Sequence, residues 1–192
     1  GGDSLNLNLT ADNDLNGTGN ILINNTISLG GGDFVVLRAI DFTTSAAIDT
    51  QGGDFIVTLA STSGRSTLGA NIDTAGGDII FNSDVILAAD LSLTGANVTF
   101  ARKVDSDGTA RSLDVNLTGA GSTRFFGKVG SISALDNLSL GSIGNAGTTR
   151  IITTQITTDG DQTYNDNVVL SSNVDMSAAN LTFARTVNSD AT

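Results

Sequence analysis

The chain has 192 residues, a formal net charge of −11 and no histidine, cysteine, proline or tryptophan, and all 20 of its acidic residues are aspartate. This charge argues against a nucleic-acid partner, because phosphate contacts need clustered lysine and arginine. The missing histidine and cysteine exclude the common catalytic triads, and no apolar run approaches the ~20 residues that a membrane-spanning helix needs. β-branched residues abound while glutamine and lysine are scarce, so the composition predicts an all-β chain.

The first part of the chain contains a short repeat that begins with Gly-Gly-Asp. The tripeptide occurs at Gly31, Gly52 and Gly76, at spacings of 21 and 24 residues, and Asn97-Val-Thr-Phe opens a further segment of the same kind. A segment of about 20 residues with three short alternating stretches and three polar corners matches one coil of a parallel β-helix. Each coil would bond to the coils on either side at a spacing of about 4.8 Å.

The segment from Ile79 to Val104 shows the coil pattern most clearly. Its apolar residues come in pairs two positions apart, which places both side chains of a pair on one face of a strand. The polar stretches between the pairs predict corners. The predicted inward residues are Ile79, Phe81, Val85, Leu87, Leu91, Leu93, Val98, Phe100 and Val104.

Segments on both sides follow the same pattern less regularly. Their predicted inward residues are Phe34, Val36, Ile40, Phe42, Phe55, Val57, Leu59, Leu113, Val115, Leu117, Leu135, Leu138, Leu140 and Ile151. Residues 61–66 and 105–112 are polar and are predicted to be loops that leave the coil, and the register is least clear over residues 141–154. Eight or nine such coils would form a rod about 40 Å long.

A longer repeat is superimposed on the coil period. Residues 98–107 (VTFARKVDSD) return 83 residues later as residues 181–190 (LTFARTVNSD), and the match extends upstream without a gap. We interpret the 83-residue unit as about four coils, so that Phe100 and Phe183 both point inward. Gln162 replaces Ile79 in the second copy, where its amide is expected to reach the backbone. Residues 1–192 are therefore predicted to form a single continuous β-solenoid segment, excerpted from a longer tandem array.

An antiparallel sandwich with one immunoglobulin-like domain per 83-residue repeat is the competing all-β interpretation. Three features favour the β-helix instead. They are the nested period of about 21 residues, the lack of proline, and predicted strands of only about three to five residues.

Aspartate occurs throughout the chain, mainly at predicted corners, where its side chain can bond backbone N–H groups. With no histidine or cysteine beside it, this distribution predicts that the chain is not an enzyme and holds no catalytic residue or cofactor. Calcium is a weaker alternative, because Asp105, Asp107 and Asp190 place carboxylate oxygens in polar stretches, although the full calcium-loop pattern is absent. Arg102 and Arg185 are expected to stabilise corners through an ion pair or through hydrogen bonds to backbone carbonyls.

Several stretches resemble the tandem repeats of filamentous-haemagglutinin-type exoproteins, which are large adhesins and filament proteins of Gram-negative bacteria, many of them exported by two-partner secretion. These stretches are residues 160–170 (GDQTYNDNVVL), 181–187 (LTFARTV), 123–130 (TRFFGKVG), 134–140 (ALDNLSL) and 156–158 (ITT). The resemblance covers residues 52–192 well and the first 50 residues loosely. It implies a right-handed parallel β-helix that forms an extracellular shaft.

The function predicted from the repeats and the resemblance is a structural shaft of an extracellular bacterial filament or surface adhesin, outside the cell or at the surface of a Gram-negative-type bacterium. Neighbouring repeats, or copies of the chain stacked end to end in a fibre, are the expected partners, without nucleic acid and without membrane insertion. The alternative is an adhesive binding module that contacts a host or cell-surface glycan, another cell or another filament. Such contacts would use a side face or loops that include Arg65 and Arg111.

Overall fold

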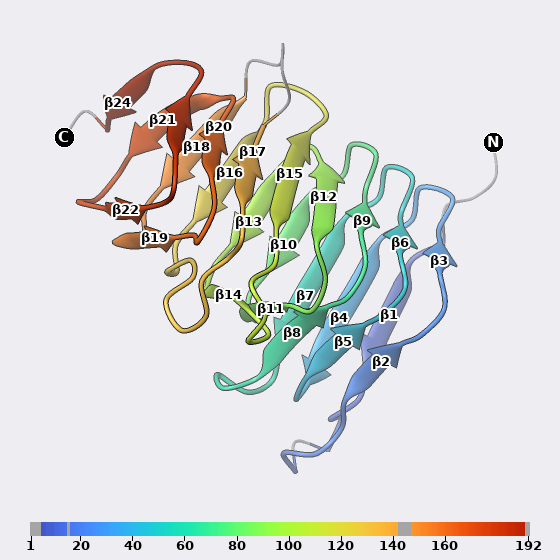
Figure 1. Cartoon of the computed structure of the whole chain (residues 1–192). Helices are drawn as coiled ribbons and strands as arrows, with labels where there is room; N and C mark the ends of the chain where they lie inside the picture. The colour runs from blue at the N-terminus through green and yellow to red at the C-terminus, as the bar shows by residue number, and fades with distance from the viewer. Residues whose placement is uncertain (1–4, 15, 142–146, 191–192) are drawn as a thin grey trace.

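The computed structural model describes residues 5–14, 16–141 and 147–190, and within these ranges the chain forms strands and turns but no helix. The strands stack in sheets that run along a common axis (Figure 1). All strand pairs in these ranges are parallel. The predicted β-solenoid with three short strands per coil is therefore confirmed.

Three sheets form the sides of the solenoid, and the chain visits them in the order A, B, C in each coil. Sheet A contains β1 (Leu7–Thr10), β4 (Phe34–Ala39), β7 (Phe55–Leu59), β10 (Ile79–Phe81), β13 (Val98–Phe100), β16 (Ser122–Phe125), β18 (Thr148–Ile151), β21 (Asn167–Leu170) and β24 (Val187–Ser189). Sheet C contains β3 (Ile27–Ser28), β6 (Ile48–Asp49), β9 (Ile72–Asp73), β12 (Leu91–Gly95), β15 (Leu113–Leu117), β17 (Leu138–Leu140), β20 (Gln162–Tyr164) and β23 (Leu181–Phe183).

Sheet B is interrupted between its fifth and sixth strands. It contains β2 (Ile21–Ile23), β5 (Phe42–Thr44), β8 (Arg65–Leu68), β11 (Asp84–Leu87), β14 (Val104–Ser106), and then β19 (Gln155–Thr157) and β22 (Asp175–Ser177). Isolated bridges from Val129 to Val104 and to Ile156 span the interruption. Eight coils are thus complete, and β24 begins a ninth.

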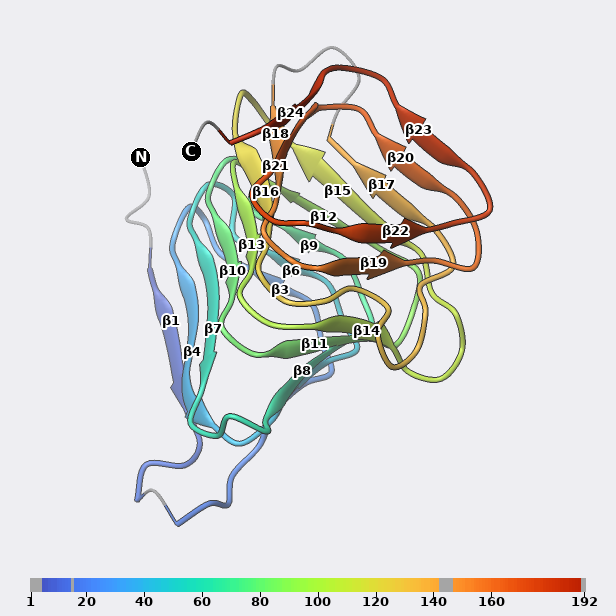
Figure 2. The same ribbon diagram turned by 90° about the vertical axis from the view of Figure 1, so that its left-hand side faces the viewer.

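The solenoid is right-handed. Figure 2 looks along the axis from the C-terminal end, and the chain passes from sheet A at the left through sheet B below to sheet C at the right while it advances toward the viewer. This counterclockwise advance is the hand that parallel β-crossovers adopt almost without exception.

One apolar core fills the interior along the axis. All nine inward residues predicted between Ile79 and Val104 are buried, which confirms the alternation in that segment. Under sheet A, the rings of Phe81, Phe100 and Phe125 form a stack with centroid separations of 5.6 and 5.0 Å. The stack arises because equivalent strand positions in successive coils lie in register.

The predicted inward set needs one correction near the start. Ile40 is only half-buried, and Ala39 is fully buried in its place. The cause is an irregularity in β4, where the pairing register shifts between Leu37 and Ala39 and Arg38 adopts a positive φ of 57°. An extra residue in a strand reverses the faces that follow it, so alternation alone could not locate this change.

The predicted loops begin and end at different residues from those expected. Arg65 and Ser66 belong to β8 rather than to a loop, and Asp105 and Ser106 belong to β14. Residues 142–146 of the stretch with unclear register lie outside the described residues, while the following β18 pairs in register with β16 and β21.

Aspartate and asparagine form hydrogen-bonded ladders at the corners between sheets. Before sheet A, the Asp33 Oδ1 accepts the Asp54 N–H at 2.9 Å, the Asp54 Oδ1 accepts the Asp78 N–H at 2.8 Å, and the Asp78 Oδ1 accepts the Asn97 side-chain amide at 2.8 Å. Asn180 donates in the same way to Asp161 before sheet C. The corner role predicted for aspartate is thus confirmed.

The buried amide of Gln162 is satisfied by the backbone, as expected. Its side chain is fully buried in β20, and its Nε2 donates to the carbonyls of Ser177 at 2.9 Å and Ile156 at 3.3 Å. The hydroxyl of Tyr164 donates to its Oε1 at 3.0 Å. A polar residue can therefore occupy an inward position here without leaving an unpaired group.

The two copies of the 83-residue repeat do not occupy equivalent places in the solenoid. β10 and β13 belong to sheet A, whereas their sequence counterparts β20 and β23 belong to sheet C. Similarly, β11 lies in sheet B and its counterpart β21 in sheet A. The repeat therefore does not span a whole number of coils, and it ends one sheet short of four coils.

Candidate functional site

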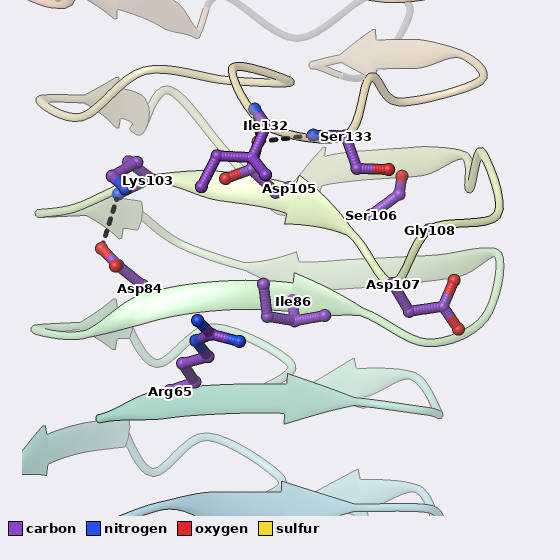
Figure 3. Close-up of a pocket in the computed structure, with 10 residues that line it drawn as sticks. All are labelled: Arg65, Asp84, Ile86, Lys103, Asp105, Ser106, Asp107, Gly108, Ile132 and Ser133. Atoms are coloured by element: carbon purple, nitrogen blue, oxygen red, sulfur yellow. Dashed lines mark hydrogen bonds between the residues drawn. The ribbon is translucent and has the colours of Figure 1, made fainter. Parts of the chain in front are cut away.

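A pocket of about 600 Å³ lies on the outer face of sheet B. It lies above β8, β11 and β14 and is bounded by the turn after β14 and by the segment around Ile132 (Figure 3). Ile86 and Ile132 give it apolar walls, and Ile132 is 75% exposed. The remaining lining residues are Arg65, Asp84, Lys103, Asp105, Ser106, Asp107, Gly108 and Ser133.

Two cations of the pocket lie on one line along the solenoid. Arg65 is paired with Asp84 in the register of β8 and β11, and Lys103 precedes Val104, whose register partner Val85 follows Asp84. The Arg65 and Lys103 side chains make no ion pair or hydrogen bond with the described residues. The hydrogen bonds of these two residues come from the backbone and include those that their N–H groups donate to Asp41 and Asp84. The pocket can therefore offer two unpaired cations to an anionic group.

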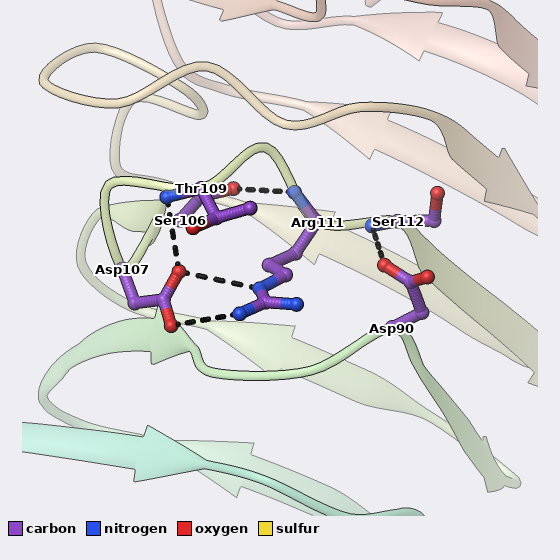
Figure 4. A network of polar contacts seen from close by, with 6 residues as sticks. All are labelled: Asp90, Ser106, Asp107, Thr109, Arg111 and Ser112. Carbon is purple, nitrogen blue, oxygen red and sulfur yellow. Dashed lines mark hydrogen bonds and ion pairs between the residues drawn. The ribbon is translucent and has the colours of Figure 1, made fainter.

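The turn that borders the pocket is held by its own polar network (Figure 4). Arg111 makes a two-pronged contact with Asp107, with both nitrogen–oxygen distances at 3.2 Å, and Asp107 also accepts the Thr109 N–H. The Arg111 guanidinium lowers the pKa of the Asp107 carboxyl from its usual value. At the same turn, the Ser112 N–H donates to Asp90 at 2.9 Å.

The three calcium candidates do not come together. Asp105 is almost fully buried and accepts the backbone N–H groups of Ile132 and Ser133, at 2.8 and 3.4 Å. Asp107 binds Arg111 as described above. Asp190 follows the last strand and contacts Arg150 at 2.6 Å, and hydrogen bonds from Ser171 and Arg150 lower its pKa. Within the described ranges, no three acidic residues are grouped as metal ligands would be.

The two corner arginines bind backbone carbonyls, which was one of the two roles expected for them. Arg102 donates to the Thr62 carbonyl at 2.6 Å, and Arg185 donates to the Asn165 carbonyl at 3.0 Å. Arg102 thereby ties the corner after β13 to the polar turn before β8.

Near the C-terminal end, the buried carboxylate of Asp166 has no hydrogen-bond partner among the residues that the structure describes. Asp166 is fully buried, and neither of its side-chain oxygens has a partner within those residues. A Cβ on Gly141 or Gly147 would come within 2.3 or 2.7 Å of this carboxylate, so glycine is needed at both positions. Burial raises the pKa of Asp166, while the charge of Arg185 acts in the opposite direction.

Of the two arginines that the sequence suggested for glycan contact, Arg65 lines the pocket, whereas Arg111 lies on the turn that borders it. The sequence did not point to the lining residues Lys103, Ile86 and Ile132. The alternation of β11 could have indicated that Ile86 points outward between the inward Val85 and Leu87. The position of Ile132 depends on the chain that replaces a strand of sheet B, for which no alternating pattern exists.

Comparisons with protein-family models, with curated proteins and with solved structures each found no match. A separate search of the described residues found no helix long and apolar enough to cross a membrane.

Proposed function

We propose that the chain is part of the structural shaft of an extracellular filament or surface adhesin of a Gram-negative-type bacterium, and that it has no catalytic activity. The observation that carries this proposal is the stacking of eight coils around one apolar core. In such an architecture each coil buries its interior against its neighbours, so length can grow without a change of fold. This property suits a rod that holds something at a distance.

The use of the acidic residues also supports a structural role. In a chain without histidine and cysteine, aspartate would have to supply acid–base chemistry. Asp33, Asp54 and Asp78 instead accept hydrogen bonds in a corner ladder, and Asp41 accepts the N–H of Arg65 at another corner. These carboxylates bond to the neighbouring coil and do not face one another across a cleft.

The strands at the two ends can accept further coils. Within the described residues, β1 pairs only with β4 and β24 pairs only with β21. The outer edges of such strands present backbone donors and acceptors that another parallel strand can bind. Neighbouring repeats, or another copy of the chain, are the partners that we propose at these edges.

Electron microscopy and fibre diffraction of the native assembly test this proposal. We expect fibres of uniform width whose diffraction shows an axial repeat near 4.8 Å, since that is the spacing of hydrogen-bonded strands. Native material that consists of short particles without an axial repeat would contradict the shaft.

The pocket on sheet B supports adhesive glycan binding as a second candidate function. Its unpaired Arg65 and Lys103 and its exposed Ile132 offer contacts to the charged groups and the apolar faces of a host or cell-surface sugar. Binding to an immobilised glycan panel should be saturable and should be lost in Arg65→Ala. Arg185→Ala, at the other end of the solenoid, is the matched control, and equal binding by both variants would exclude the pocket.

A further inference from the structure

A column of apolar side chains runs along the outer face of sheet A. Val35, Ile56 and Ile80 oppose one another in the register of β4, β7 and β10, and each is partly exposed. Leu37, beside this column in β4, is 42% exposed, and Phe126, directly after β16 further along the axis, is 49% exposed. The outward positions of sheet C carry serine, threonine, asparagine and aspartate instead. An exposed apolar sheet face of this kind marks an interaction surface.

Aspartates precede the strands near one end of this face, and arginines lie in the strands toward the other end, with the exposed Arg38 of β4 as an exception at the aspartate end. Asp33, Asp54 and Asp78 precede β4, β7 and β10, and each uses only its Oδ1 in the ladder, so its Oδ2 has no partner among the described residues. Further along the axis, Arg124 and Arg150 occupy the outward column in β16 and β18. The side chain of Arg124 has no partner among the described residues, whereas that of Arg150 contacts Asp190. The strands of sheet A themselves contain no aspartate.

A face that is acidic toward one end and basic toward the other becomes complementary to itself when it is turned end for end. We propose that sheet A binds sheet A of a second copy, with the two solenoids side by side and antiparallel. The two-fold axis would run parallel to the strands, between β10 and β13. β7 then lies opposite β16 of the other copy, which brings Asp54 near Arg124 and places Ile56 against the aliphatic part of that arginine.

Charge and polarity favour an antiparallel second copy as the partner of sheet A over other partners. Two parallel copies would set Arg124 and Arg150 of one copy against the same arginines of the other, and like charges that face each other are repulsive. The outer face of sheet C as a partner would offer no apolar surface to the column of Val35, Ile56 and Ile80. A polyanion would cover Arg124 but would leave that column in water.

Sedimentation equilibrium of the chain, with Ile56→Asp and Ile86→Asp as a matched pair, tests the interface. Both isoleucines point outward, but Ile86 lies on sheet B. We expect a concentration-dependent dimer that Ile56→Asp weakens by at least about tenfold, because a carboxylate would be buried in an apolar contact. Ile86→Asp should dimerise as the parent chain does. A monomer at millimolar concentration, or equal weakening by both variants, would overturn the proposal.

Single cysteines introduced into this cysteine-free chain test the orientation. Spin labels on Thr99→Cys, next to the proposed axis, should give a short distance between copies, whereas labels on Asn8→Cys, at the far end of sheet A, should give a long one. Short distances from both sites would show a parallel pair and would overturn the antiparallel arrangement.

The pairing is independent of the shaft function and can be separated from end-to-end stacking. Growth at the strand edges would yield species larger than a dimer, and Ile56→Asp would leave that growth unchanged. Loss of the dimer with retention of long species would therefore identify the sheet A contact specifically. Long species that also disappear in Ile56→Asp would show that this face builds the fibre itself, contrary to the antiparallel pair.

Discussion

Phe100 and Arg102 lie two positions apart at the end of β13, and they contribute to stability in different ways. Phe100 is fully buried between the rings of Phe81 and Phe125. Arg102 is partly exposed and makes one described hydrogen bond, to the Thr62 carbonyl. The inward side chain should therefore matter far more than the corner side chain, although both recur in the sequence repeat.

We expect Phe100→Ala to lower the free energy of unfolding by about 3–5 kcal/mol, since it removes a large buried ring and leaves a cavity. Arg102→Ala should cost about 1 kcal/mol or less, because the hydrogen bond can be exchanged for one with water. Urea unfolding of the two variants measures both losses. The reverse order would mean that the inward and outward assignments in β13 are wrong.

Asp166 should make stability depend on pH. Its pKa in the folded chain is raised, mainly by burial, so the folded state holds the proton more tightly than the unfolded state does. Its contribution is therefore most favourable at low pH and is lost as the pH rises from the unfolded pKa through the folded one. Asp166→Asn should raise the melting temperature at pH 7 and have less effect at pH 4.

Exposed Asp175 in β22 provides the control for this comparison. Asp175→Asn should leave the difference between the melting temperatures at pH 4 and pH 7 as it is in the parent chain. A melting temperature of Asp166→Asn that equals the parent's at both pH values would show that the buried carboxylate is paired in solution.

At the scale of the strand and its corner, the ladder before sheet A joins successive coils through side chains. Asp54→Ala removes the acceptor of the Asp78 N–H, and we expect it to cost about 1 kcal/mol. Asp54→Asn keeps an oxygen at the same place and removes one charge from a column of like charges, so it should be as stable as the parent or more stable. Thermal melts at low salt compare the two.

Melting temperatures at several salt concentrations test the same comparison in a second way. If the gain of Asp54→Asn comes from relieved repulsion, it should shrink as the ionic strength rises. An equal loss of stability in both Asp54 variants would indicate that the charge, and not the acceptor, holds the corner.

The strand pattern could be predicted where alternation is strict, as in the segment from Ile79 to Val104, because burial alternates with every residue of a strand. The irregularity at Arg38 could not be predicted, because no residue type marks it in the sequence. It is seen only in the pairing of β4 with β7, where the register shifts. The pocket could be predicted only in part. Arg65 stood out by its charge, but its proximity to Lys103 depends on the register between coils.

At the scale of the whole molecule, stability should vary along the axis, because each coil contacts only its neighbours. Phe183 occupies the last complete coil, is only partly buried, and has one described aromatic partner, Tyr164, at 5.0 Å. Phe183→Ala should therefore cost less than Phe100→Ala. Hydrogen exchange should likewise show slower exchange in β10 and β13 than in β22 and β23, and uniform protection along the axis would contradict nearest-neighbour stability.

The mismatch between the 83-residue repeat and the coil has a consequence for how such a rod lengthens. β10 and β20 share a sequence pattern but lie in different sheets. The same strand and corner sequence can therefore form more than one side of the solenoid. Duplication of the gene segment therefore places the outward residues of the copy on a different side of the solenoid axis. A chain with many such copies would present each outward residue along a spiral around the rod, visible from every direction instead of from one.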